Sequence, residues 1–147
     1  PYVTEVTLHD GLTGLDDNVL PTNNTESFNN RCIPIHSDIY VTFDYFMNTD
    51  TSSISTNDAD TQCRDETIQV SSDNFSTNNN CVKIASPPAI SNNNKTFKLD
   101  PVDNLTYNTT YTVRVTTDVQ DALENNMTSQ YNHSGFTTAA FHSTTPT

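Results

Sequence analysis

The feature that most constrains the fold is the strict alternation of polar and apolar residues in the segment 110–117, TYTVRVTT. Tyr111, Val113 and Val115 fall on one face of an extended chain, and polar residues occupy the other face. A period of two residues is typical of a β-strand that buries one of its faces. The alternation therefore predicts a strand that contributes side chains to a core.

The residues just before this strand predict a specific turn. The segment 105–109 reads LTYNT, and its Asn and Thr residues favour a tight turn. In Greek-key sandwiches, a Tyr at the start of a late strand bonds through its hydroxyl to the backbone a few residues upstream, an arrangement called a tyrosine corner. Tyr111 has the corresponding position, so we expect a buried ring whose hydroxyl meets the backbone of this turn.

Further strands are predicted along the chain, separated by loops rich in Asn, Ser and Thr. The predicted strands are 2–9, 38–46, 67–70, 81–85, 95–100, 110–117 and 134–141. The only helical pattern is 119–125, which is at most two turns long. This arrangement predicts a single all-β domain over residues 1–147, an Ig-like Greek-key sandwich of about seven strands with long polar loops.

Two of the predicted strands have a clear apolar face. In the strand 2–9, this face carries Tyr2, Val6 and Leu8. In the strand 38–46 it carries Ile39, Val41, Phe43 and Tyr45. We expect both faces to point into the core.

The charge of the chain excludes several classes of partner. The formal net charge is -12, with only six Lys and Arg residues. Nucleic acids and anionic membranes both require a basic surface, so we expect neither as a partner. We also expect no membrane insertion, because no apolar run is long enough to cross a bilayer.

Several short motifs are spread over most of the chain in a fixed order. They are PYVTEV, DGLTG (10–14), IYVTFDYFMN (39–48), the segment 95–126 and GFTT (135–138). Together they resemble the bacterial Ig-like domains of S-layer and other cell-surface proteins. The resemblance implies an extracellular, cell-surface module with a structural role. The chain departs from the family pattern in its three cysteines and in the segment 16–32, which looks inserted.

The segment 16–32 suggests how such a module assembles. Fully extended, it reaches roughly 55 Å, which is longer than a domain. We therefore expect the N-terminal strand 1–9 to leave its own sandwich and to insert Tyr2, Val6 and Leu8 into a neighbouring copy. This strand exchange would build a head-to-tail filament of copies of the chain. The alternative is that the strand closes onto its own domain, which then acts as a spacer in a larger adhesin or S-layer protein.

A third alternative is a module that binds glycans. Such a module needs exposed aromatic side chains on which sugar rings can stack. The candidates are Tyr2, Tyr40, Tyr107 and Tyr131. The strand pattern accounts for most of the aromatic residues as core or strand partners.

The three cysteines allow one disulfide and leave one thiol. We expect Cys63 to pair with Cys81, which closes a loop of about 20 residues and adds roughly 3 kcal/mol of stability. A disulfide indicates a location outside the cytosol. Cys32 is then either a buried thiol or a bridge between subunits. A zinc site is not expected, because the cysteines are not clustered.

Seven Asn-x-Ser/Thr sequons occur in predicted loops or at strand ends, where a glycosylation acceptor must lie. They are Asn23, Asn74, Asn94, Asn104, Asn108, Asn126 and Asn132. We expect several of them to carry N-linked glycans. The alternative is that a composition rich in Asn, Ser and Thr generates sequons without modification.

Neither a metal site nor an active site is predicted. Asp58, Asp60 and Asp65 cluster in an acidic segment that lacks the Gly and the final Glu of an EF-hand loop. Ser134 lies outside any nucleophile-elbow motif. The histidines are scattered, at positions 9, 36, 133 and 142. We therefore expect a protein that is not an enzyme and that needs no cofactor.

Overall fold

The structure is a computed structural model that describes residues 1–9, 19–21 and 33–139. Within these residues the chain forms strands and turns without a helix, which confirms the predicted all-β class. The strands are β1 (Val3–His9), β2 (Val19–Pro21), β3 (Asp38–Phe43), β4 (Ile68–Ser71), β5 (Ala89–Ser91), β6 (Thr96–Leu99), β7 (Thr110–Val115), β8 (Tyr131–Asn132) and β9 (Phe136–Thr137).

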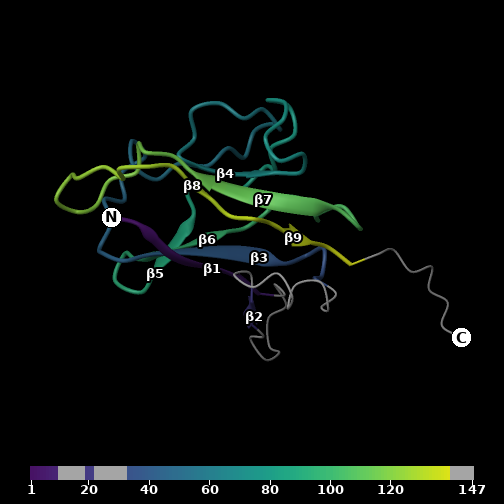
Figure 1. The fold of residues 1–147 in the computed structure, drawn as a ribbon, viewed down its shortest axis with the longest axis horizontal. Helices are drawn as coiled ribbons and strands as arrows, with labels where there is room; N and C mark the ends of the chain where they lie inside the picture. The colour runs from purple at the N-terminus through teal and green to yellow at the C-terminus, as the bar shows by residue number, and fades with distance from the viewer. Residues whose placement is uncertain (10–18, 22–32, 140–147) are drawn as a thin grey trace, which may run out of the picture.

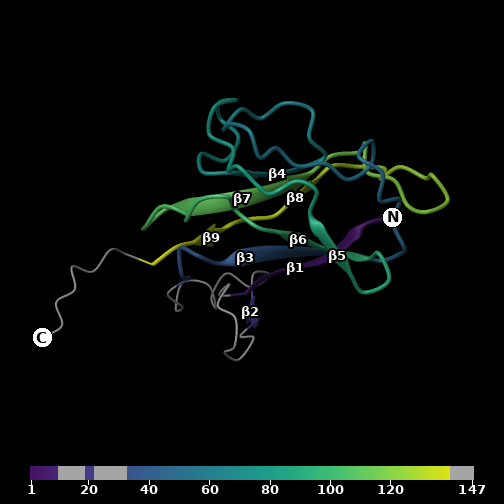
Figure 2. The same ribbon diagram turned by 180° about the vertical axis from the view of Figure 1, so that it is seen from behind.

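The strands form two antiparallel sheets that stack as layers (Figures 1 and 2). One sheet has the order β2-β1-β3-β6-β5. The other has the order β4-β7-β8, and β9 also pairs with β7. Strands that are adjacent in sequence are often not neighbours in a sheet, as expected of a sandwich.

The core lies between the two sheets and is built from the alternating faces of their strands. Val113 and Val115 of β7 are fully buried, as are Ile39 and Val41 of β3. Aromatic rings also pack in the core. Phe43 meets Phe97 edge to face, and Tyr111 stacks on Phe136 of β9. The alternation in the sequence therefore identifies the inner faces of β3 and β7 correctly.

Two predicted core residues point outward, for different reasons. Tyr2 is 62% exposed, because a β-bulge between Val3 and Glu5 changes which side of β1 faces the core. Val3 packs against the core instead. Tyr45 is 39% exposed, because β3 ends at Phe43 and the next residues bend away.

Other elements differ from the predictions where the sequence signal is weak. The segment 81–85 forms isolated bridges and not a continuous strand. The segment 119–125 is a turn and not a helix, because the Asp121 carboxylate accepts the backbone N–H groups of Leu123 and Asn125 at 2.9 Å each. The short strands β2, β5 and β8 were not predicted, since two or three residues are too few for an alternation to show.

Asparagine takes the place of glycine in the turns. The chain has only three glycines, yet seven other described residues have a positive φ, and five of these are Asn. Asn tolerates the left-handed conformation because its short polar side chain bonds to the local backbone. The polar loops therefore form tight turns despite the scarcity of glycine.

Candidate functional site

The segment from Cys81 to Ala85 crosses from one sheet to the other, and its first residues line a surface hollow. The backbone N–H of Val82 donates to Val70 of β4, at 2.8 Å. Three residues later, the N–H of Ala85 donates to Asp100, next to β6, at 2.9 Å. This segment therefore covers the edge strand β4 and joins it to the end of β6 in the other sheet.

A disulfide fastens the crossing segment to the loop before β4. Cys63 and Cys81 are bonded, and their Cα atoms lie 5.3 Å apart, as a disulfide requires. The predicted pairing is confirmed. Cys32 lies outside the described residues, so its state stays a prediction.

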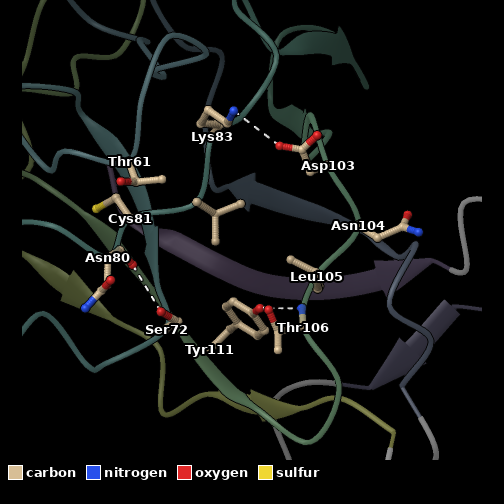
Figure 3. Close-up of a pocket in the computed structure, with 11 residues that line it drawn as sticks. Thr61, Ser72, Asn80, Cys81, Lys83, Asp103, Asn104, Leu105, Thr106 and Tyr111 are labelled. Atoms are coloured by element: carbon tan, nitrogen blue, oxygen red, sulfur yellow. Dashed lines mark hydrogen bonds and ion pairs between the residues drawn. The ribbon is translucent and has the colours of Figure 1, made fainter. Parts of the chain in front are cut away.

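Beside the disulfide lies a hollow of about 190 Å³, shown in Figure 3. Its walls carry neutral polar side chains such as Thr61 and Asn80. An ion pair between Lys83 and Asp103 spans 3.2 Å at the rim, as Figure 3 shows. The Asp103 side chain is mostly exposed, so the pair contributes little stability.

Tyr111 forms the inner wall of this hollow. Its ring is only 3% exposed, and its hydroxyl accepts the backbone N–H of Thr106 at 2.7 Å. Figure 3 shows this bond at the base of the hollow. Leu105, just before the bond, is buried. This is the geometry of a tyrosine corner, with the hydroxyl meeting the turn that precedes β7.

A second hollow, of about 250 Å³, holds a cluster of charged residues that sequence analysis did not single out. Asp38 is buried, and its carboxylate lies 3.6 Å from the ammonium of Lys98. The pKa of Asp38 is raised to about 6, mainly by burial. The positive charge of Lys98 opposes this rise, and the nearby Asp100 carboxyl adds to it. Strand pairing places this cluster together, because Asp38 of β3 lies beside the end of β6. Its members come from distant parts of the sequence, so no local motif could reveal them.

The N-terminal strand lies in its own sheet, which is the arrangement of the alternative to strand exchange, and exchange between copies stays a prediction. β1 pairs with β3 along its length, and the chain buries Val6 and Leu8 in its own core. The third residue of the predicted exchange, Tyr2, is exposed and is held through its backbone to Asp44. The physical reason is that β3 offers a complete antiparallel partner within the same chain, at a far higher effective concentration than any neighbouring copy.

The predicted linker 16–32 is only partly described. Its short strand β2 pairs with β1 at the edge of the sheet. Residues 22–32 lie outside the described residues, as does the sequon at Asn23. Each of the other six sequon asparagines is exposed: Asn74, Asn94, Asn104, Asn108, Asn126 and Asn132.

The described histidines have separate environments. The ring of His9 packs on Tyr40 at 4.2 Å between centroids. His133 is buried, and its Nδ1 accepts the N–H of Gly135. His36 lines the second hollow, and its buried Nδ1 lacks a hydrogen-bond partner among the described residues. His142 lies outside the described residues.

The acidic segment that resembles a calcium loop is held by protein groups. The Asp60 carboxylate accepts two hydrogen bonds from Arg64, at 2.8 and 3.1 Å. These bonds and those from Gln62 and Asn57 lower the pKa of Asp60. In the part of the chain that the structure describes, no group of three or more His, Cys, Asp or Glu residues is arranged to hold a metal ion.

The four tyrosines considered for sugar binding are distributed over the molecule. Tyr2 and Tyr131 line a hollow of about 120 Å³ near the N-terminus. Tyr107 is exposed on the turn before β7. Tyr40 is half-buried and packs on a histidine ring. The structure therefore brings two of the four together.

Comparison with known proteins gives one match. The model of a family described as bacterial Ig-like domain matches residues 16–138. The opening motifs PYVTEV and DGLTG precede this match, whereas the other motifs lie within it. No curated protein and no solved structure matches the chain. Among the described residues, no helix is long and apolar enough to span a membrane.

Proposed function

The chain belongs to the bacterial Ig-like domain family, and from this premise we propose that it is a structural spacer module in the extracellular part of a larger surface protein. Modules of this family typically occur in surface or extracellular proteins and have structural roles. A spacer holds other domains apart without chemistry of its own. The type of surface protein, including the S-layer type, stays a prediction.

The observation that carries the proposal is the placement of the two ends of the described chain. β1 begins toward one end of the long axis, and the described chain ends just after β9, toward the other end (Figures 1 and 2). A polypeptide that continues from both ends would leave in opposite directions. Modules joined in this way form an extended row, which is the geometry that a spacer needs.

The strand pairing suits a module under tension. β1 and β3 are antiparallel neighbours with six paired positions, from Val3 with Phe43 to His9 with Asp38. A force that pulls the N-terminus along the long axis acts along these strands, so it loads several hydrogen bonds together. The disulfide between Cys63 and Cys81 further limits how far the chain can extend.

Two other properties support an extracellular location. Disulfides such as the bond between Cys63 and Cys81 form and persist in oxidising environments outside the cytosol. The net charge of -12 favours solubility at an exposed surface, because like-charged molecules repel one another. Neither property requires a ligand.

The test compares the chain with a tandem of two copies joined end to end. Light scattering should show a monomer for the single chain. Small-angle X-ray scattering should show that the tandem has a maximum dimension close to twice that of one copy. Polymers of the single chain, or a compact side-by-side tandem, would overturn the proposal.

A further inference from the structure

We propose that Asn104 is an attachment site for an N-linked glycan and that the folded protein presents it for modification. Asn104 differs from the other described sequons in that both of its reacting side chains are free of hydrogen bonds. The inference concerns the folded domain and requires only export from the cytosol. It therefore shares its premise of an extracellular location with the proposed function, but not the arrangement as a spacer.

The side chain of Asn104 is exposed on a ridge between two hollows. It lines both the hollow beside the disulfide and the hollow that contains Asp38. Figure 3 shows its amide pointing away from the other side chains of the first hollow. Among the described residues, this amide has no hydrogen-bond partner. The acceptor nitrogen is therefore accessible without breaking a contact.

The hydroxyl of the sequon is equally accessible. Thr106, two residues after Asn104, is exposed, and its side chain has no hydrogen-bond partner in the described part of the chain. The backbone around it is anchored, because Leu105 donates its N–H to Ile35 at 2.7 Å and Thr106 donates its N–H to Tyr111. The fold therefore holds the sequon backbone in place and leaves its side chains free.

Two other sequons use the Asn side chain itself. The amide nitrogen of Asn126 donates to the backbone oxygen of Thr117 at 2.8 Å, and its amide oxygen accepts a bond from Gln120. The amide oxygen of Asn132 accepts a bond from Gln130, and Asn132 belongs to strand β8. Modification of either residue in the folded state has to break these contacts.

In the remaining three described sequons, the hydroxyl residue is bound and the asparagine is in a left-handed turn. The φ angles of Asn74, Asn94 and Asn108 are 58°, 63° and 52°. The hydroxyl of each sequon already has a partner. The Ser76 hydroxyl bonds to the backbone oxygen of Asp73, the Thr96 hydroxyl to the side-chain hydroxyl of Thr42, and the Thr110 hydroxyl to the side-chain hydroxyl of Thr137. An enzyme that must hold this hydroxyl has to break the existing hydroxyl contact first.

The modification is a transfer of a sugar from an activated donor, a polyprenyl diphosphate oligosaccharide. The Asn104 amide nitrogen forms a bond to the anomeric carbon of the sugar and loses one proton. The bond from that carbon to the phosphate oxygen breaks, the polyprenyl diphosphate leaves with the electron pair, and the proton passes to solvent. No oxidant or reductant takes part.

The test uses the folded, disulfide-bonded chain with a single-subunit oligosaccharyltransferase that requires only Asn-x-Ser/Thr, and with its lipid-linked donor. Peptide mapping then gives the initial rate of glycan attachment at each described site. Attachment at Asn104 should be about tenfold faster than at Asn126. The Asn126 amide must first be released from its hydrogen bonds, and the free energy that this costs corresponds to a rate difference of about tenfold. In the reduced and denatured chain, this difference should disappear.

Matched variants separate the sequon from the fold. Thr106→Ser keeps the sequon and should keep the glycan, whereas Thr106→Val removes the sequon and should abolish modification at Asn104. Thr128→Val removes the sequon of Asn126 and should leave Asn104 unaffected. Equal rates at Asn104 and Asn126 in the folded chain would overturn the proposal. Modification of the denatured chain only would also overturn it, without bearing on the spacer geometry.

Discussion

The backbone N–H of Thr106 donates a hydrogen bond of 2.7 Å to the hydroxyl of Tyr111, five residues further along the chain. The Tyr111 ring stacks on Phe136 of β9, with centroids 5.7 Å apart. The bond thus fastens the turn before β7 to a side chain of the core. It also shapes the inner wall of the hollow beside the disulfide.

Replacing Tyr111 with Phe tests this bond. We expect Tyr111→Phe to lower the free energy of unfolding by about 1 to 1.5 kcal/mol, because the Thr106 N–H loses its partner while the ring remains. Chemical denaturation measures the change. Tyr2→Phe, at an exposed position, is the control and should have little effect. Equal effects of the two substitutions would contradict the role of the bond.

Removing the disulfide should lower the stability of the fold. We expect the double variant Cys63→Ser, Cys81→Ser to lose roughly 3 kcal/mol, because the unfolded chain regains the freedom of the closed loop. Thermal unfolding measures the loss. Peptide mapping without reductant checks the pairing directly. A peptide in which Cys32 is joined to either of the other cysteines would contradict the structure.

The burial of Leu8 tests whether β1 belongs to its own sandwich. Leu8→Ala removes a fully buried side chain and should cost about 2 to 5 kcal/mol. If the strand packs within its own chain, the melting temperature of this variant does not depend on protein concentration. Glu5→Ala, at an exposed position of the same strand, is the control. A melting temperature that rises with concentration would revive strand exchange.

Asp38 should make the stability depend on pH. Its folded pKa is raised to about 6 from the ordinary 3.8, so the folded state binds the proton more tightly than the unfolded state. Its contribution to stability is therefore fully present below about pH 4 and is lost as the pH rises through 6. At pH 7 the free energy of unfolding should be lower by at most about 3 kcal/mol, because each unit of difference between the folded and unfolded pKa corresponds to about 1.36 kcal/mol.

The variant Asp38→Asn checks this dependence. The neutral amide resembles the protonated carboxyl, so the variant should be more stable than the unsubstituted protein at pH 7. It should also lose the increase in stability that the unsubstituted protein shows between pH 7 and pH 4. Denaturation at several pH values gives the comparison. An unchanged pH profile would show that another group is responsible.

Gly135 is needed where the chain passes close to β7. Its φ is 113°, and an added Cβ would lie 3.0 Å from the backbone oxygen of Tyr111. We expect Gly135→Ala to destabilise the protein by about 1 to 3 kcal/mol through backbone strain. Ser134→Ala, at the exposed neighbouring position, is the control. Similar melting temperatures for both variants would contradict this requirement.

The predictions from the sequence succeeded where a signal was local and repeated. The alternation placed Val113 and Val115 in the core, because a strand turns successive side chains to opposite faces. It was wrong for Tyr2 and Tyr45, because a bulge and an early strand end depend on the pairing partner. The helical pattern at 119–125 does not form a helix, because the Asp121 carboxylate binds the local backbone and forms a turn.

The sequence by itself determined the all-β class and the inner faces of β3 and β7, and it favoured the pairing of Cys63 with Cys81. These features follow from side-chain periodicity and from the small number of ways to pair three cysteines. Only the tertiary structure decided that β1 stays in its own sheet and that Asp38 meets Lys98. It also showed which sequon side chains are free. The physical reason is that strand pairing brings together residues that are distant along the chain, and burial and hydrogen bonding depend on these neighbours.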